Sequence, residues 1–168
     1  MSITEFDQLN EEGKKQLLKD CCDCTSWIKK MLGIFPVQNL VDLLEYAEEE
    51  WYDCNAADWL ETFKHQKPIT QMDFIQQELK SDSSTHISND SKNKISNQEI
   101  ELQLNAAADL YEKTFGYHFI FFRTTENARK ILNILNRRLK NDGDKELHIA
   151  ADEQNKITQS RLQKLFAD

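Results

Sequence analysis

Glycine and proline are scarce in this sequence, with four Gly and two Pro among 168 residues. Because these residues mark tight turns, their scarcity argues against a turn-rich β protein and favours helices. Long apolar runs are also missing, since no segment approaches the roughly 20 apolar residues that span a bilayer. The first residues lack the apolar core of a signal peptide. The sequence therefore predicts a helical, cytoplasmic protein without a membrane partner.

Basic residues are outnumbered by acidic ones. Lys and Arg number 21 against 29 Asp and Glu, which gives a formal net charge of −8 at pH 7. Non-specific binding to nucleic acid or to an anionic membrane requires clustered Lys and Arg. We therefore expect no nucleic-acid partner.

Several signatures of catalytic and metal sites are absent too. The chain has no glycine-rich phosphate loop, no G-x-S-x-G elbow and no H-E-x-x-H motif. Its four cysteines are Cys21, Cys22, Cys24 and Cys54, and no second cluster of Cys or His lies at a zinc-like spacing from them. The sequence therefore predicts reduced thiols and no metal site.

Apolar residues recur at helical spacing along most of the chain. This pattern predicts an all-α fold, a single-domain bundle of about seven or eight helices over residues 1–168. Gly116 is expected to cap the end of one long helix. The expected helices begin at Ser2 or Thr4, Asn10, Thr25, Asn39, Asn55, Gln98, Thr124 or Thr125, and Lys145.

Residues 81–97 differ in composition from the rest of the chain. They are mostly Ser, Asn, Asp and Thr, and their apolar side chains are Ile87 and Ile95. Such a composition predicts a polar internal loop. The loop could be a solvated linker or an active-site loop, because long loops in compact domains are often functional.

The C-terminal third contains one extended segment and the last helix. Residues 117–122, "YHFIFF", have strand propensity, but no second strand is available to pair with them, so we expect a buried extended segment. Arg161 lies four residues from Ile157 and from Leu165, on a face expected to be buried, where it would need an anionic partner. The expected core face of this helix is Leu147, Ala150, Ala151, Ile157, Leu162 and Leu165.

The order of motifs adds a resemblance that covers nearly the whole chain. An N-A-x-x-x-x-Y helix ("NAAADLY"), an F-G-Y-x-F segment, an "ARKILNILNRRL" helix and a closing "EQNKITQSRL" helix follow one another. This order resembles that of the 2-oxo-4-hydroxy-4-carboxy-5-ureidoimidazoline (OHCU) decarboxylases, helical enzymes of the urate-to-allantoin pathway. The resemblance implies decarboxylation of a small acidic imidazoline substrate to (S)-allantoin without a cofactor. It also implies a homodimer, for which the apolar side chains of Trp27, Trp51 and Trp59 could supply an interface.

The resemblance also implies site residues, with two departures from the family pattern. The family places a catalytic histidine before a proline after its W-L-x-x-F helix. Here the sequence is His65-Gln66-Lys67-Pro68, and alignment on Ile69 puts Gln66 at the histidine position and His65 one residue earlier. We therefore take His65 as the candidate catalytic imidazole and Gln66 as a candidate substrate-binding residue.

The second departure falls in the polar loop. The family's S-N-E-Q motif is nearest to "SNDS", residues 88–91, so Asp90 stands in place of the catalytic glutamate and Ser88 is a candidate substrate-binding residue. Arg161 matches the family's substrate-binding arginine. Residues 119–123 match its substrate-lining segment, which makes Phe119, Ile120 and Phe121 candidate substrate-binding residues.

Three functions are compatible with these departures. The chain could be an active OHCU decarboxylase that uses His65, Asp90 and Arg161. It could be a non-catalytic relative that acts as a ligand- or protein-binding module, as the changes at both catalytic motifs would suggest. It could also act on a different small acid, with Gln66 setting the new specificity.

Overall fold

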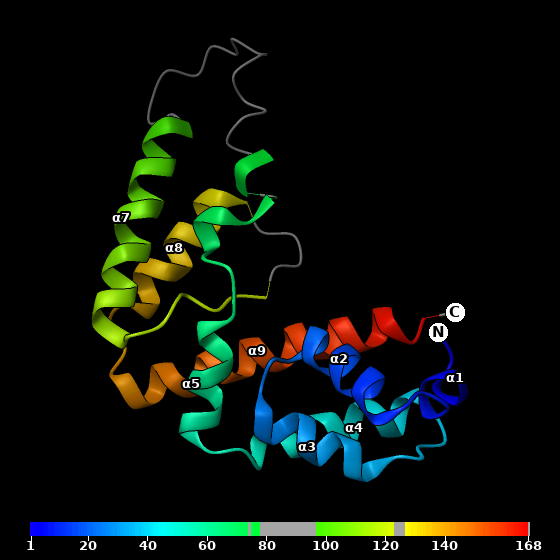
Figure 1. Ribbon diagram of the computed structural model, residues 1–168. Helices are drawn as coiled ribbons and strands as arrows, with labels where there is room; N and C mark the ends of the chain where they lie inside the picture. The colour runs from blue at the N-terminus through cyan, green and yellow to red at the C-terminus, as the bar shows by residue number, and fades with distance from the viewer. Residues whose placement is uncertain (74, 78–96, 123–126, 168) are drawn as a thin grey trace. The chain divides into compact units, whose positions relative to one another are not determined.

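The computed structural model describes residues 1–73, 75–77, 97–122 and 127–167. The described residues contain eight α-helices with complete bounds, one 3-10 helix and no strand, which confirms the all-α prediction (Figure 1). No helix among them is long and apolar enough to cross a membrane. The elements are α1 (Ile3–Asp7), α2 (Glu11–Cys21), α3 (Thr25–Ile34), α4 (Leu40–Tyr52), α5 (Ala56–Lys64), η1 (Ile69–Gln71), α7 (Asn97–Phe115), α8 (Ala128–Arg138) and α9 (Gly143–Leu165).

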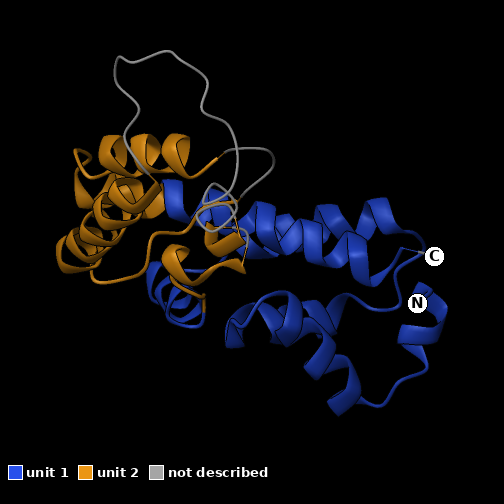
Figure 2. Cartoon of the chain, turned by 90° about the horizontal axis from the view of Figure 1, so that it is seen from above, with its two compact units in different colours: residues 1–65, 149–168 blue, residues 66–148 orange. Residues whose placement is uncertain are grey.

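The chain divides into two compact units. Unit 1 comprises residues 1–65 and 149–168, and unit 2 comprises residues 66–148, so α9 begins in unit 2 and continues in unit 1 (Figure 2). A single domain over residues 1–168 stays a prediction. Residues 81–96 of the polar loop lie outside the described residues, and Asn97 is the first residue of α7.

Local capping signals locate most helix starts correctly. Ser2 and Asn55 form capping boxes with Glu5 and Asp58, and the side chains of Asn10 and Asn39 also accept backbone hydrogen bonds. The prediction for α8 was wrong. Its N-cap is Asn127, whose Oδ1 accepts a hydrogen bond from the Lys130 amide at 3.0 Å, whereas Thr124 and Thr125 lie outside the described residues.

Three buried tryptophans connect the helices of unit 1. The indole nitrogen of Trp27 donates to the Ala47 carbonyl at 2.9 Å, and that of Trp51 donates to the Ala151 carbonyl at 3.0 Å. Trp59 in turn donates to the Trp51 carbonyl at 3.0 Å. All three side chains are buried, so the expectation that they could supply a dimer interface was wrong. Each ring packs in the core because its N–H has a backbone partner there.

In unit 2 the long helix α7 ends as the sequence predicts. Gly116 has a φ of 81°, in the left-handed region that favours glycine, and its amide donates to the Glu112 carbonyl at 2.8 Å. Residues 117–122 then form neither helix nor strand, and the side chains of Phe119, Ile120 and Phe121 are buried. The predicted buried extended segment is confirmed.

The expected core face of α9 was only partly correct. Ala150, Ala151 and Leu162 are buried, whereas the other three expected positions, Leu147, Ile157 and Leu165, are half-buried. Polar side chains take core positions instead. One of them is Thr158, whose hydroxyl donates to the Gln154 carbonyl at 3.1 Å within the helix. The buried polar side chains of this helix are Glu146, Gln154, Asn155 and Thr158.

Candidate functional site

His65 lies at the C-terminal end of α5, in unit 1. Its backbone amide donates to the Thr62 carbonyl at 3.1 Å, and Pro68 follows three residues later, where the helix has ended. Its Nδ1 atom lies 3.1 Å from Asp23 Oδ2 and 3.3 Å from the Asp23 carbonyl oxygen. Because both neighbours are acceptors, Nδ1 carries a hydrogen. The side chain is 46% exposed, so solvent or a ligand can reach the ring.

Arg161 lies on α9, also in unit 1. The side chain is half-buried, and its Nη1 atom donates to the carbonyl oxygen of Cys21, the last residue of α2, at 3.1 Å. A cation at this place complements the carbonyl groups that have no partner inside the helix. The predicted approach of Arg161 to Phe119 and Ile120 stays a prediction.

The short segment Cys21–Asp23 therefore meets both candidate side chains. His65 contacts Asp23, and Arg161 contacts Cys21 two residues earlier. The carboxylate beside His65 among the described residues is thus Asp23, a residue that the sequence analysis missed. Asp23 is the aspartate within "CCDC", a motif that was considered only as a possible metal site because of its thiols.

The remaining predicted site residues lie elsewhere. Ser88 and Asp90 fall outside the described residues. Gln66 is half-buried and is the first residue of unit 2. In the extended segment the rings of Phe119 and Phe121 stack with their centroids 5.8 Å apart, and both side chains are buried together with Ile120. This segment can therefore offer a ligand its backbone more readily than its side chains.

A buried network in unit 2 fixes one point of this segment. Arg138 Nη1 donates to the Ile120 carbonyl at 2.8 Å, while Nε and Nη2 bind Glu146 Oε1 at 2.7 Å and 2.6 Å. The hydroxyl of Tyr111 donates to the same Oε1 at 2.5 Å, and Asn141 donates to Oε2 at 2.7 Å. This network was not predicted from the sequence. Its signal was the position of Arg138 after Leu135 on the apolar face of α8.

Similarity to known proteins agrees with these features. The OHCU decarboxylase family matches residues 7–163.

The chain belongs to the OHCU decarboxylase family.

Three known proteins show how similar this chain is to its relatives in sequence and in structure. The chain is 32% identical over 158 residues to the uric acid degradation bifunctional protein TTL of Arabidopsis thaliana, with 89% of this chain and 46% of that protein covered. It therefore spans about half the length of that curated relative. A crystal structure of OHCU decarboxylase in the presence of (S)-allantoin matches with a TM-score of 0.73 and 27% identity, covering 95% of this chain and all of the other.

A crystal structure of (S)-allantoin synthase matches with a TM-score of 0.72, over 98% of this chain and 54% of the other. Its identity to this chain is 13%, so this match speaks for the fold alone.

Unit 1 contains four buried free thiols, and the backbone carbonyl of one of them, Cys21, contacts Arg161. The Cys22 thiol hydrogen-bonds the side chains of Thr62 and Thr158, and burial raises its pKa far above the usual range. Burial also raises the pKa of Cys21 to about 11. A hydrogen bond from Cys54 lowers the pKa of Cys24 to about 7. No group of three or more His, Cys, Asp or Glu in the described part of the chain is arranged to hold a metal ion.

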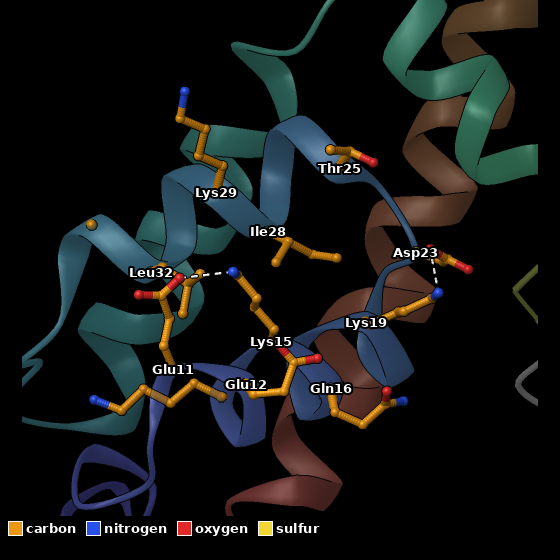
Figure 3. Close-up of a pocket in the computed structure, with 12 residues that line it drawn as sticks. Glu11, Glu12, Lys15, Gln16, Lys19, Asp23, Thr25, Ile28, Lys29 and Leu32 are labelled. Carbon is orange, nitrogen blue, oxygen red and sulfur yellow. Dashed lines mark ion pairs between the residues drawn. The ribbon is translucent and has the colours of Figure 1, made fainter.

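An open groove also lies between α2 and α3 (Figure 3). Its walls carry charges of both signs that pair with each other, since Lys15 lies 2.7 Å from Glu11 and Lys19 lies 3.9 Å from Asp23. Neither His65 nor Arg161 is among its lining residues. We therefore do not place the candidate site in this groove.

Proposed function

We propose that this chain is a cofactor-independent carboxy-lyase that converts OHCU to (S)-allantoin in urate degradation. The observation that carries the proposal is the arrangement of His65 and Arg161 on the segment Cys21–Asp23, with contacts of 3.1 Å in each case. An imidazole and a guanidinium held on one short segment suit a reaction that must bind an anion and deliver a proton. Membership of the OHCU decarboxylase family supports the same reaction.

The chemistry explains why these two residue types are needed. Loss of carbon dioxide breaks one carbon–carbon bond and leaves its electron pair on the ring carbon. The pair is shared with the neighbouring ring carbon, which carries the ureido group, while the hydroxyl on the first carbon becomes a carbonyl. A proton then adds to one face of that neighbouring carbon, and the choice of face sets the configuration of the product. The step takes up one proton and transfers no electrons to an external acceptor, so its balance requires no redox cofactor.

Arg161 would bind the carboxylate of the substrate. A guanidinium presents paired donors that match a planar anion, and its side chain is already held at one nitrogen by the Cys21 carbonyl. Fixing the carboxylate orients the bond that breaks. Such positioning lowers the barrier because the reacting geometry is set before the reaction begins.

His65 would supply the proton from Nε2 of its doubly protonated, imidazolium form. Asp23 accepts the Nδ1 hydrogen and orients the ring, which leaves Nε2 as the nitrogen that would transfer the proton. The resemblance assigned the partner carboxylate to Asp90, and that assignment also stays a proposal. Gln66, in contrast, carries an amide that can hydrogen-bond a substrate but cannot exchange a proton near neutral pH.

The decisive experiment is an assay on freshly generated OHCU, followed by circular dichroism of the product. OHCU decays without an enzyme, and that decay gives racemic allantoin, so the protein must raise the rate and also produce an excess of the S enantiomer. A rate and an enantiomer ratio equal to those of the protein-free control would overturn the proposal. A non-catalytic ligand-binding relative would then be the better account.

A further inference from the structure

Arg138 and Glu146 form an ion pair inside unit 2. The side chain of Arg138 is 5% exposed and that of Glu146 is fully buried. Arg138 comes from the last turn of α8 and Glu146 from the first turn of α9. Both charges are thus removed from water, and each must find its partners within the protein.

Such a pair is a weak way to stabilise a fold. Removing two charges from water opposes their attraction, and apolar residues of similar volume often stabilise a core equally well. A buried pair can nevertheless select one geometry over others. In unit 2 this pair is placed to set the geometry of the extended segment, residues 117–122.

A series of contacts leads from Glu146 through the Arg138 guanidinium to the extended segment. Glu146 Oε1 accepts from Arg138 Nε and Nη2 and from the Tyr111 hydroxyl, while Asn141 donates to Oε2. These contacts fix the plane of the guanidinium. Nη1 then points at the Ile120 carbonyl oxygen, 2.8 Å away, and the guanidinium carbon lies 4.5 Å from the centroid of the Phe119 ring.

The extended segment has side-chain contacts of its own, such as His118 Nδ1 with Glu112 Oε2 at 3.1 Å, but no regular backbone pattern. Residues 117–122 belong to no helix or strand, so no ladder of backbone hydrogen bonds sets their path. The charged hydrogen bond to Ile120, together with the cation–π contact to Phe119, fixes the middle of the segment from one side chain. A change at Arg138 would therefore act on the backbone of residues 119–121.

We propose that Arg138, held by Glu146, is a positioning residue that sets the backbone of residues 119–121 for substrate binding. This inference rests on the proposed function and on the family resemblance, which makes Phe119, Ile120 and Phe121 candidate substrate-binding residues. Neither Arg138 nor Glu146 touches the substrate in this proposal. Their effect passes through the Ile120 carbonyl.

The test uses the double variant Arg138→Met with Glu146→Leu. The single variant Arg138→Met leaves the Glu146 carboxylate buried beside no cation and is expected to destabilise the fold, whereas the double variant removes both charges. Circular dichroism checks that the double variant is folded. Arg137→Met is the matched control, because Arg137 is the neighbouring arginine on α8 and its side chain is exposed.

Two readouts separate positioning from general stability. Hydrogen exchange of the peptide spanning residues 117–122 should become at least about tenfold faster in the double variant, while exchange in residues 128–135 of α8 stays as in the wild type. In the OHCU assay, kcat/KM should fall by about tenfold to a hundredfold, mainly through a higher KM, because a displaced backbone loses substrate contacts. The control should match the wild type in both readouts.

The inference is overturned if the folded double variant exchanges at the wild-type rate over residues 117–122. It is also overturned if exchange is faster but KM and kcat remain those of the wild type. A wild-type protein without turnover would instead contradict the proposed function. In that case a wild-type exchange rate in the double variant refutes the anchoring, and a faster rate supports it.

Discussion

The Nη1 atom of Arg161 donates to the carbonyl oxygen of Cys21 at 3.1 Å, across 140 residues of sequence. This contact ties the last helix to the end of α2. Cys21 precedes Asp23 by two residues in the sequence. The Asp23 carboxylate in turn lies 3.1 Å from Nδ1 of His65.

Replacing Arg161 with lysine should preserve the fold and reduce kcat/KM for OHCU by about a hundredfold. Lysine keeps the positive charge but cannot present paired donors to a carboxylate. Circular dichroism would verify the fold, and the OHCU assay would measure turnover. Arg137→Lys on α8 is the control, since that side chain is exposed. Equal losses in the two variants would show that Arg161 has no particular role.

Replacing His65 with asparagine should lower kcat by about a hundredfold or more, the usual contribution of a positioned acid or base. Asparagine retains a polar side chain at the end of α5 but cannot transfer a proton. The control is His148→Asn, because His148 is exposed on α9 and contacts the Asp144 carbonyl. An unaffected kcat in His65→Asn would remove the imidazole from the mechanism.

Replacing Gln66 with histidine should raise kcat/KM by about tenfold. The resemblance places the catalytic histidine of the family at this position, and an imidazole there could share the proton transfer with His65. The comparison is Gln66→Asn, which shortens the amide without adding a titratable group. A loss of activity in Gln66→His would indicate that the amide itself binds the substrate.

Replacing Tyr111 with phenylalanine should lower the free energy of unfolding by about 1.5–3 kcal/mol, the usual worth of a hydrogen bond to a charged group. Its buried hydroxyl donates to Glu146 at 2.5 Å, and burial raises the pKa of this tyrosine far above its usual range. The control is Tyr52→Phe, because Tyr52 is exposed and its hydroxyl donates to Asp152 Oδ1 at 2.8 Å. Urea unfolding should find a much smaller loss for that variant.

Stability should fall as the pH rises above about 9, and Cys22 should contribute to this fall. Burial raises the pKa of Cys22 in the folded state, so the unfolded thiol ionises first and the folded state holds one more proton. Its contribution to stability is complete below the unfolded pKa and is lost at higher pH. Cys21, with a pKa raised to about 11, acts in the same direction.

The variant Cys22→Ala tests this sign. Between pH 9 and 10 its free energy of unfolding should depend less steeply on pH than that of the wild type, by up to about 1.4 kcal/mol per pH unit. Below pH 8 the two proteins should show parallel dependence, because the thiol is then protonated in both states. Parallel curves above pH 9 as well would mean that the thiol ionises equally in the folded state.

Local features of the fold could be predicted from the sequence because they depend on neighbours a few residues apart. Ser2, Asn10, Asn39 and Asn55 cap helices through contacts with amides two or three residues later. Gly116 ends α7 by adopting a positive φ that side chains disfavour. The helical spacing of apolar residues was enough to predict the all-α fold, and the order of the motifs was enough to recognise the family.

Only the tertiary structure decided which distant side chains meet. Asp23 beside His65 and Cys21 beside Arg161 are separated in sequence by 42 and 140 residues, so no local pattern reports them. Helical periodicity also treats apolar residues as the core. It therefore placed Leu147 inside and overlooked Glu146, which is buried because Arg138, Tyr111 and Asn141 satisfy its oxygens. Burial of a charge depends on partners that packing supplies, and packing is set by the whole chain.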